Sequence, residues 1–217
     1  MFGKDYMLDA LEAISRDIIE HEEELNHLDN VIGDGDHGTN MARFARIILR
    51  DLPELKANKD NMGEILQHVG MRCITEIGGS AGPLFGKFYL QAGMIKIDNL
   101  EMEEANLVAA FEEGAMGVAH IGRSTEGEKT MLDALFPAVR AMQQALEEGH
   151  GFVEILQAGA EAAGKGVEYT KTIQASKGRA AYIGERSIGH QDPGATTVML
   201  MLQSMCRTAA ARSAGLE

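Results

Sequence analysis

The sequence predicts an all-α protein, an eight-helix antiparallel up-and-down bundle with its functional loops at one end. Apolar residues recur at spacings of three and four along most of the chain, and no segment alternates as a β-strand would. Aromatic residues make up only 5% of the sequence, whereas Ala, Leu, Met and Glu, which favour helices, are abundant. The 217 residues suffice for one substantial core, so we expect a single domain over residues 1–217.

The first four helices are predicted from apolar stripes that end at proline or glycine. Pro53 ends the second helix, Gly78 and Gly79 end the third, and Pro83, at a favoured first helical position, begins the fourth. The stripes consist of Leu8, Leu11, Ile14, Ile18, Leu25 and Leu28 in the first helix; Met41, Phe44 and Ile48 in the second; Met62, Ile65 and Val69 in the third; Leu84, Phe85 and Phe88 in the fourth.

The second four helices follow the same periodicity, and the last begins at Pro193 and Gly194. Their stripes consist of Leu107, Val108, Phe111 and Val118 in the fifth helix; Met131, Leu135, Val139 and Met142 in the sixth; Phe152, Ile155, Leu156 and Val167 in the seventh; Val198, Met199, Leu202 and Met205 in the eighth.

The chain is acidic, with 20 Lys and Arg against 33 Asp and Glu and a formal net charge of −13. This charge repels nucleic-acid phosphates and anionic lipid surfaces, so we expect neither as a partner. No apolar run approaches the roughly 18 residues of a membrane span. The two cysteines, Cys73 and Cys206, lie far apart in apolar helical stretches, which predicts buried thiols, no disulfide and a cytoplasmic protein.

The links between helices differ in a regular way. Those after the first, third, fifth and seventh helices, at 29–40, 77–83, 121–130 and 176–197, are rich in glycine and polar residues, whereas the links after the even-numbered helices are not. Successive loops of an up-and-down bundle alternate between its ends, so the four unusual links should converge on one site. The link from 176 to 197, expected to lack secondary structure, is long enough to suggest a function.

Three carboxylates crowd the first of these links. Asp29, Asp34 and Asp36 would repel one another unless a hard cation lay among them, and Mg²⁺ and Ca²⁺ take oxygen ligands of this type. The alternative is a polar turn built on Asp-Gly steps. The link lacks the final Glu of an EF-hand, which makes a calcium sensor the weaker interpretation and favours Mg²⁺ shared with a phosphate.

Glycines precede two helices of the predicted site. Residues 78–83 lead into the fourth helix and Gly38, Thr39 and Asn40 into the second, so backbone N–H groups could face an anion there, although each stretch alone could be a simple cap. Neither matches a P-loop or a dinucleotide fingerprint.

Basic residues and a histidine in the same links could contact a bound phosphate. Arg179, Arg186 and Lys129 are available to neutralise phosphate, while solvation is favoured for Lys177. His37 beside the acidic cluster is either a phosphate or hydrogen-bonding contact or a structural residue.

Four motifs, at 32–40, 78–86, 127–135 and 177–197, together resemble the nucleotide-binding L subunits of dihydroxyacetone kinase, and they cover nearly the whole chain in the same order. The resemblance implies an eight-helix antiparallel barrel whose loops hold ADP or ATP through two Mg²⁺ ions. It implies that Asp29, Asp34 and Asp36 ligate the metals. The implied nucleotide contacts are His37, Gly38, Thr39, Asn40, Ser80, Ala81, Gly122, Met131, Arg179, Asp192, Pro193 and Gly194. The family often has the order Ala-Ser where this chain has Ser80-Ala81, which leaves open which position makes a side-chain contact.

The resemblance also implies a reaction and two partners. A phosphoryl group would pass from the nucleotide to dihydroxyacetone held on a separate K subunit, and a phosphohistidine protein of the sugar phosphotransferase system would rephosphorylate bound ADP. The alternatives are a subunit that exchanges ATP and serves another short ketose, a regulatory module that senses Mg-ADP without catalysis, and a Mg²⁺-dependent phosphohydrolase.

Overall fold

The computed structural model describes residues 2–57, 61–95 and 102–215, and in these ranges the chain forms nine α-helices and one 3₁₀ helix without a β-strand. Parts of two even-numbered links, 58–60 and 96–101, lie outside the described residues. The helices are α1 (Lys4–Glu20), α2 (Glu22–Ile32), α3 (His37–Ala57), α4 (Met62–Glu76), α5 (Ala81–Ala92), α6 (Glu104–Gly122), α7 (Leu132–Glu147), α8 (Phe152–Thr170), η1 (Arg179–Ser187) and α9 (Pro193–Ser213).

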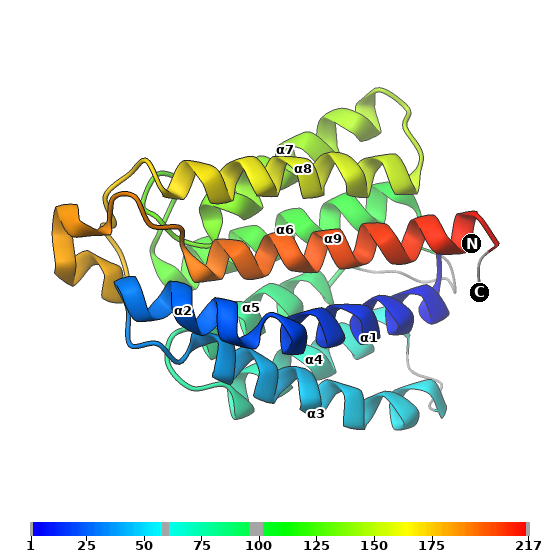
Figure 1. The fold of residues 1–217 in the computed structure, drawn as a ribbon. Coiled ribbons are helices and arrows are strands. Elements are labelled where there is room, and N and C mark those ends of the chain that lie inside the picture. Colours follow the sequence, from blue (N-terminus) through cyan, green and yellow to red (C-terminus); the bar gives the residue numbers. More distant parts are fainter. Residues whose placement is uncertain (1, 58–60, 96–101, 216–217) are drawn as a thin grey trace.

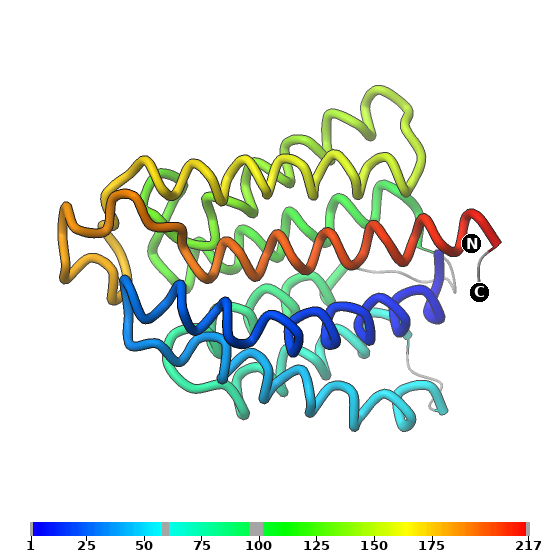
Figure 2. Tube along the Cα trace, viewed as in Figure 1, coloured from blue at the N-terminus to red at the C-terminus, as the bar shows by residue number. Residues whose placement is uncertain are grey.

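The helices form a closed ring. From α3 to α9 each α-helix packs on the next one in sequence, α1 packs on α3, and α9 packs back on α1, so the ring has no open edge (Figure 1). The glycine-rich links lie at the end of the ring where η1 projects, and the start of α1 and the end of α9 lie at the opposite end (Figure 2). The predicted all-α up-and-down architecture is therefore confirmed.

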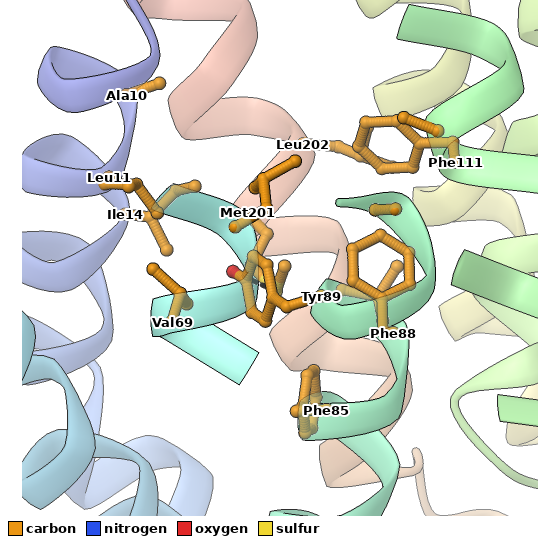
Figure 3. Packing of buried hydrophobic residues seen from close by; sticks show 14 of the residues in the cluster. Ala10, Leu11, Ile14, Val69, Phe85, Phe88, Tyr89, Phe111, Met201 and Leu202 are labelled. Atoms are coloured by element: carbon orange, nitrogen blue, oxygen red, sulfur yellow. Dashed lines mark hydrogen bonds between the residues drawn. The ribbon is translucent and has the colours of Figure 1, made fainter. Parts of the chain in front are cut away.

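One hydrophobic core fills the ring. Side chains from α1, α4, α5, α6 and α9 meet in its centre (Figure 3). The two phenols buried there keep hydrogen-bond partners, because Tyr6 donates to the carbonyl oxygen of Met205 at 3.1 Å and Tyr89 contacts the sulfur of Met201 at 4.0 Å. Among the described residues, no helix combines the length and apolar character needed to cross a membrane.

Several predicted helix boundaries were wrong. The first helix is interrupted at His21, whose imidazole Nδ1 lies 2.8 Å from the carbonyl oxygen of Asp17 and competes with the helical bonding there. Three glutamates then begin α2, where negative charge stabilises a helix N-terminus. The second predicted helix does not stop at Pro53 but continues to Ala57, because Leu55 beyond the proline is buried in the core.

Two further predictions need correction. The helix expected from Pro83 begins at Ala81, which places the proline in the first turn, where its missing N–H costs no hydrogen bond. The long link to α9 contains the 3₁₀ helix η1 in place of an unstructured loop. Cys73 is buried as expected, but Cys206 is only half-buried.

Helices α7 and α8 approach each other at a glycine, which gives a testable stability difference. A Cβ at Gly166 would lie 2.0 Å from the carbonyl oxygen of Asp133, whereas a Cβ at Gly164 would meet its nearest neighbour, Met199 Sδ, at 3.8 Å. Gly166→Ala should therefore lower the free energy of unfolding by about 3 kcal/mol through overpacking. Gly164→Ala, the matched control, should raise it by about 0.5–1 kcal/mol through helix propensity. Urea denaturation of both variants checks the opposite signs, and equal effects would contradict the close approach.

Candidate functional site

The four unusual links enclose one cavity of about 490 Å³ at the end of the ring. The link between α2 and α3 contributes Asp34, the link between α4 and α5 contributes Gly79, the link between α6 and α7 contributes Thr130, and the link between α8 and α9 contributes Arg179. The convergence expected from loop parity is therefore confirmed.

Three carboxylates lie together at one side of this cavity. One oxygen each from Asp29, Asp34 and Asp36 lie within 4.8 Å of one another. Asp29 stands in the last turn of α2, and its Oδ2 accepts hydrogen bonds from the backbone N–H of Asp36 at 2.9 Å and of His37 at 3.2 Å. A Cβ at Gly33 would come within 2.1 Å of Asp29 Oδ1, so glycine is needed for the turn to pass this carboxylate.

The carboxylate cluster fits a divalent cation. All its donors are hard oxygens, the type that Mg²⁺ prefers, and Asp34 and Asp36 are exposed toward solvent. Arg179 reaches across from η1 and places its Nη2 2.9 Å from Asp34 Oδ2. The guanidinium of Arg179 thus pairs with one of the three carboxylates, which indicates that the cluster requires positive charge.

His37 lies beside the carboxylates but points its ring toward α9. Its Nε2 is 2.8 Å from Thr197 Oγ1, and that hydroxyl donates to the carbonyl oxygen of Pro193 at 3.0 Å. The hydroxyl can then only accept from the imidazole, which assigns the proton to Nε2. Burial lowers the pKa of His37 to about 4 despite the opposing charges of Asp29 and Asp36, so the ring is neutral at physiological pH.

Two residues singled out by the resemblance do not line the cavity. Gly38 lies against α2, where a Cβ would come within 2.0 Å of the Glu22 carbonyl oxygen. Thr39 exchanges hydrogen bonds of 2.9 Å with the side chain of Asn26, through both its backbone N–H and its hydroxyl. In this structure both residues pack the start of α3 against α2, whereas Asn40, one residue further, does line the cavity.

The N-terminus of α5 opens toward the cavity. Gly78, Gly79, Ser80 and Ala81 all line it, and Gly79 has a left-handed φ of +66° that glycine adopts without strain. Ser80 makes no side-chain capping hydrogen bond to the helix. The first backbone N–H groups of α5 therefore remain available for an anion.

Part of the cavity lining is apolar, and we call this part the apolar wall. It includes Leu84, Phe85, Val118, Ile121, Met131 and Leu132. Of these, the resemblance implies a nucleotide contact only for Met131, and Gly122 also lines the cavity. The sequence does not predict the other five as site residues, although their places near the ends of three helices could have marked them.

The last turn of the site precedes α9. Asp192 Oδ2 caps this helix by accepting from the N–H of Ala195 at 2.7 Å, and Pro193 and Gly194 follow it on the cavity wall. The pKa of Asp192 is raised to about 7, mainly by burial and also by the charges of Asp133 and Asp29, against the lowering effects of the Ala195 hydrogen bond and of Lys129.

The basic residues divide into two groups. Arg179 and Lys177 line the cavity, and Lys177 also donates to the carbonyl oxygen of Arg123 at 2.7 Å. Arg186 lies outside the lining, and its Nε lies 3.5 Å from the carbonyl oxygen of Ile183. Lys129, expected to neutralise phosphate, also belongs to the lining, but in this structure its ammonium donates to the backbone carbonyl oxygens of Thr170 and His190.

Comparison with known proteins places this geometry in context. The model of the DAK2 domain matches residues 31–207. The chain is 42% identical over 194 residues to the PEP-dependent dihydroxyacetone kinase, ADP-binding subunit DhaL, of Escherichia coli K12, covering 89% of this chain and 91% of that protein. It is 32% identical to the PTS-dependent dihydroxyacetone kinase, ADP-binding subunit DhaL, of Lactococcus lactis, covering 97% of this chain and all of that protein (100%).

A solved structure has the same fold. The dihydroxyacetone kinase of C. freundii in complex with AMP-PNP and Mg²⁺ superposes with a TM-score of 0.72 at 27% identity. The match covers 93% of this chain but only 33% of that larger one.

Proposed function

The chain belongs to the DAK2 domain family, among the DhaL subunits of dihydroxyacetone kinase, and from this membership we propose that it binds ADP and ATP with Mg²⁺ and supplies the phosphoryl group for dihydroxyacetone held on a separate K subunit. The chain is proposed as one nucleotide-binding domain over residues 1–217, since one core joins the described α-helices of the ring. The proposed location is the cytoplasm.

The observation that carries this proposal is that one cavity contains both a carboxylate cluster and a set of apolar side chains. A nucleotide offers a matching pair of features, with charged phosphates at one end and a flat base at the other. Its phosphates would lie near Asp29, Asp34 and Asp36 and the open N-terminus of α5, and its base against the wall around Ile121 and Met131.

The three aspartates are the proposed ligands of two Mg²⁺ ions. When bound there, Mg²⁺ would neutralise phosphate charge and polarise the transferred group. The chain itself contributes binding and orientation: backbone N–H groups of residues 79–81 would hold phosphate oxygens, and Arg179 would donate to them. The remaining proposed nucleotide contacts are His37, Gly38, Thr39, Asn40, Gly122, Asp192, Pro193 and Gly194, with Gly38 and Thr39 acting through the packing of α3 on α2.

The source of the phosphoryl group is proposed to be a phosphohistidine protein of the phosphotransferase system, which would recharge ADP in place. Two relatives that this chain matches over nearly their full lengths are described as PEP-dependent and PTS-dependent. The chain covers only 34% of human triokinase/FMN cyclase, at 30% identity. Coverage therefore favours a separate L subunit over an ATP-exchanging enzyme for another ketose.

The proposal predicts that purified protein carries ADP. After denaturation, ion-exchange chromatography should detect about one ADP per chain, and chelation of Mg²⁺ beforehand should release it because the phosphates lose their counter-charge. Addition of the K subunit, dihydroxyacetone, phosphoenolpyruvate and the phosphotransferase proteins should then give dihydroxyacetone phosphate.

Three other outcomes would contradict this proposal in different ways. If the chain and the K subunit phosphorylate dihydroxyacetone with ATP as the only phosphoryl donor, the nucleotide is an exchanging substrate and not a bound coenzyme. Bound ADP without any product would favour a regulatory module, and phosphate release by the chain alone would indicate a phosphohydrolase.

A further inference from the structure

A buried lysine is part of the cavity lining, but its ammonium group is bonded to backbone carbonyl oxygens. Lys129 belongs to the link between α6 and α7 and is only 1% exposed. Its ammonium donates to the carbonyl oxygens of Thr170 and His190 and lies 3.5 Å from that of Ile173. An ammonium group has three N–H donors, so these three carbonyls match its full capacity.

The three carbonyls belong to both ends of one segment. Thr170 ends α8 and Ile173 follows it, while His190 comes shortly before α9. The segment between them, 171–192, carries η1 and its Arg179. Lys129 thus joins the two ends of this segment to the link that carries Thr130 and Met131.

Further hydrogen bonds hold this junction together. The N–H of Asp192 donates to Thr170 Oγ1 at 3.0 Å, and the carboxylate of Asp133 accepts from the N–H groups of Gly127 at 2.5 Å and Thr130 at 2.7 Å. Lys129 itself has a left-handed φ of +60°, a conformation that costs a residue with a Cβ about 1–2 kcal/mol. The contacts of its ammonium are the compensating interaction.

We propose that Lys129 is a positioning residue, a tethered ammonium ion in a cage of backbone carbonyls that fixes the 171–192 segment against the nucleotide cavity. It sets the place of Arg179 and of the turn from Asp192 to Gly194, and it does not touch the phosphates. The inference rests on the proposed nucleotide site for its functional consequence, although the carbonyl cage is independent of that site.

The electrostatic surroundings agree with a charged lysine. Burial lowers the pKa of Lys129, but the negative charges of Asp192 and Asp133 oppose that effect. A neutral amine has two N–H donors, so it would leave one of the three carbonyl oxygens without a bond from Lys129. Loss of that bond is costly where the oxygen is buried, as it is at Thr170. Rings of carbonyl oxygens also bind free monovalent cations, which suggests that a small ammonium ion could replace the side chain.

Chemical rescue tests this proposal. Lys129→Ala leaves space for n-propylammonium, which has the three carbons and the nitrogen that the substitution removes. The variant should bind Mg-ADP about 10–100-fold more weakly, as when groups that support a binding site are lost. Without nucleotide, amides in 171–192 should exchange hydrogen faster. Added n-propylammonium should restore both properties, whereas n-propanol or NaCl at equal concentration should not.

Two variants serve as controls. Lys129→Met fills the space with an apolar chain, so it should show faster exchange that n-propylammonium does not reverse, and it replaces the alanine variant if that one fails to fold. Lys165→Ala, at an exposed position of α8, should match the wild type.

The readouts separate the possible failures. The proposal would be overturned if Lys129→Ala kept both the hydrogen-exchange rates and the ADP affinity of the wild type. It would also be overturned if the variant bound ADP more weakly while hydrogen exchange in 171–192 stayed unchanged, since Lys129 would then contact the nucleotide directly. If n-propylammonium restores neither the ADP affinity nor the slow hydrogen exchange of the variant, Lys129 does not act as a tethered cation. If the wild type binds no ADP, the proposed function fails while hydrogen exchange still tests the carbonyl cage.

Discussion

Replacing Asp34 with asparagine is expected to weaken Mg²⁺-dependent ADP binding about 100-fold or more. Loss of a group that merely supports a metal ligand costs about 10–100-fold, so loss of a ligand charge should reach the upper end of that range. Asp34 gives the cleanest test of the cluster because it is exposed and its observed ion pair is with Arg179. Asp29 also closes the turn onto two backbone N–H groups, so its substitution would disturb the fold as well.

Titration calorimetry with ADP, in Mg²⁺ and in EDTA, measures this effect. Glu23→Gln removes the same charge from an exposed position of α2 and should leave the affinity within twofold. The surface ion pair with Arg179 contributes at most about 1 kcal/mol, so the melting temperature of Asp34→Asn should barely change. Equal ADP affinity for Asp34→Asn and the wild type would remove Asp34 from the proposed metal ligands.

The convergence of the four links on one site could be predicted from the sequence, because it depends only on the number of helices between the links. Each predicted helix reverses the chain, so the odd-numbered links had to share an end, whatever their side chains did. The break at His21 did not disturb that parity, since α2 continues along the same side of the ring as α1 (Figure 1). An extra helix that turned back would have separated the links.

What could not be predicted was the direction in which individual side chains point. A lysine in a glycine-rich link is a reasonable candidate for a phosphate contact. The ammonium of Lys129 nevertheless turns inward, because the end of α8 and the residues before α9 present carbonyl oxygens to it. Gly38 and Thr39 sit inside a matching motif but face α2. These contacts join residues far apart in the chain or depend on helix rotation, and neither is visible in local spacing.

Pro53 illustrates the same limit for the fold. Its local preference is to end a helix, and it removes one hydrogen bond. The tertiary structure overrides that preference, because the turn beyond it buries Leu55 at 3% exposure.

Replacing Asp192 with asparagine is expected to stabilise the metal-free protein at neutral pH and to change its pH dependence. The pKa of this carboxyl rises from its ordinary 3.8 to about 7 in the folded protein. Below pH 4 both states hold the proton, so the group has no net effect. Between pH 4 and 7 the unfolded chain ionises first, and folding stability falls as the pH rises; above pH 7 the loss is complete.

Asparagine keeps the cap on α9, because its amide oxygen can still accept from the N–H of Ala195. Asparagine carries no charge, so the stability of the variant should not fall between pH 4 and 7 through this position. Urea denaturation in EDTA should therefore give equal stabilities near pH 4 and a difference that grows to about 2 kcal/mol at pH 8, roughly half the full linkage value because the cavity beside Asp192 admits water. Parallel pH profiles would contradict the raised pKa.

The same variant connects stability to ligand binding. A carboxylate that costs folding energy at neutral pH persists at this position beside the proposed nucleotide, where perturbed groups tend to gather. If Asp192 serves the site, Asp192→Asn should be more stable yet bind Mg-ADP more weakly. The substitution removes a buried charge that costs stability, and with it the favourable interaction of that charge with Lys129. Calorimetry on the variant used for denaturation measures both properties, and a gain in stability with unchanged ADP affinity would restrict Asp192 to its role as the cap of α9.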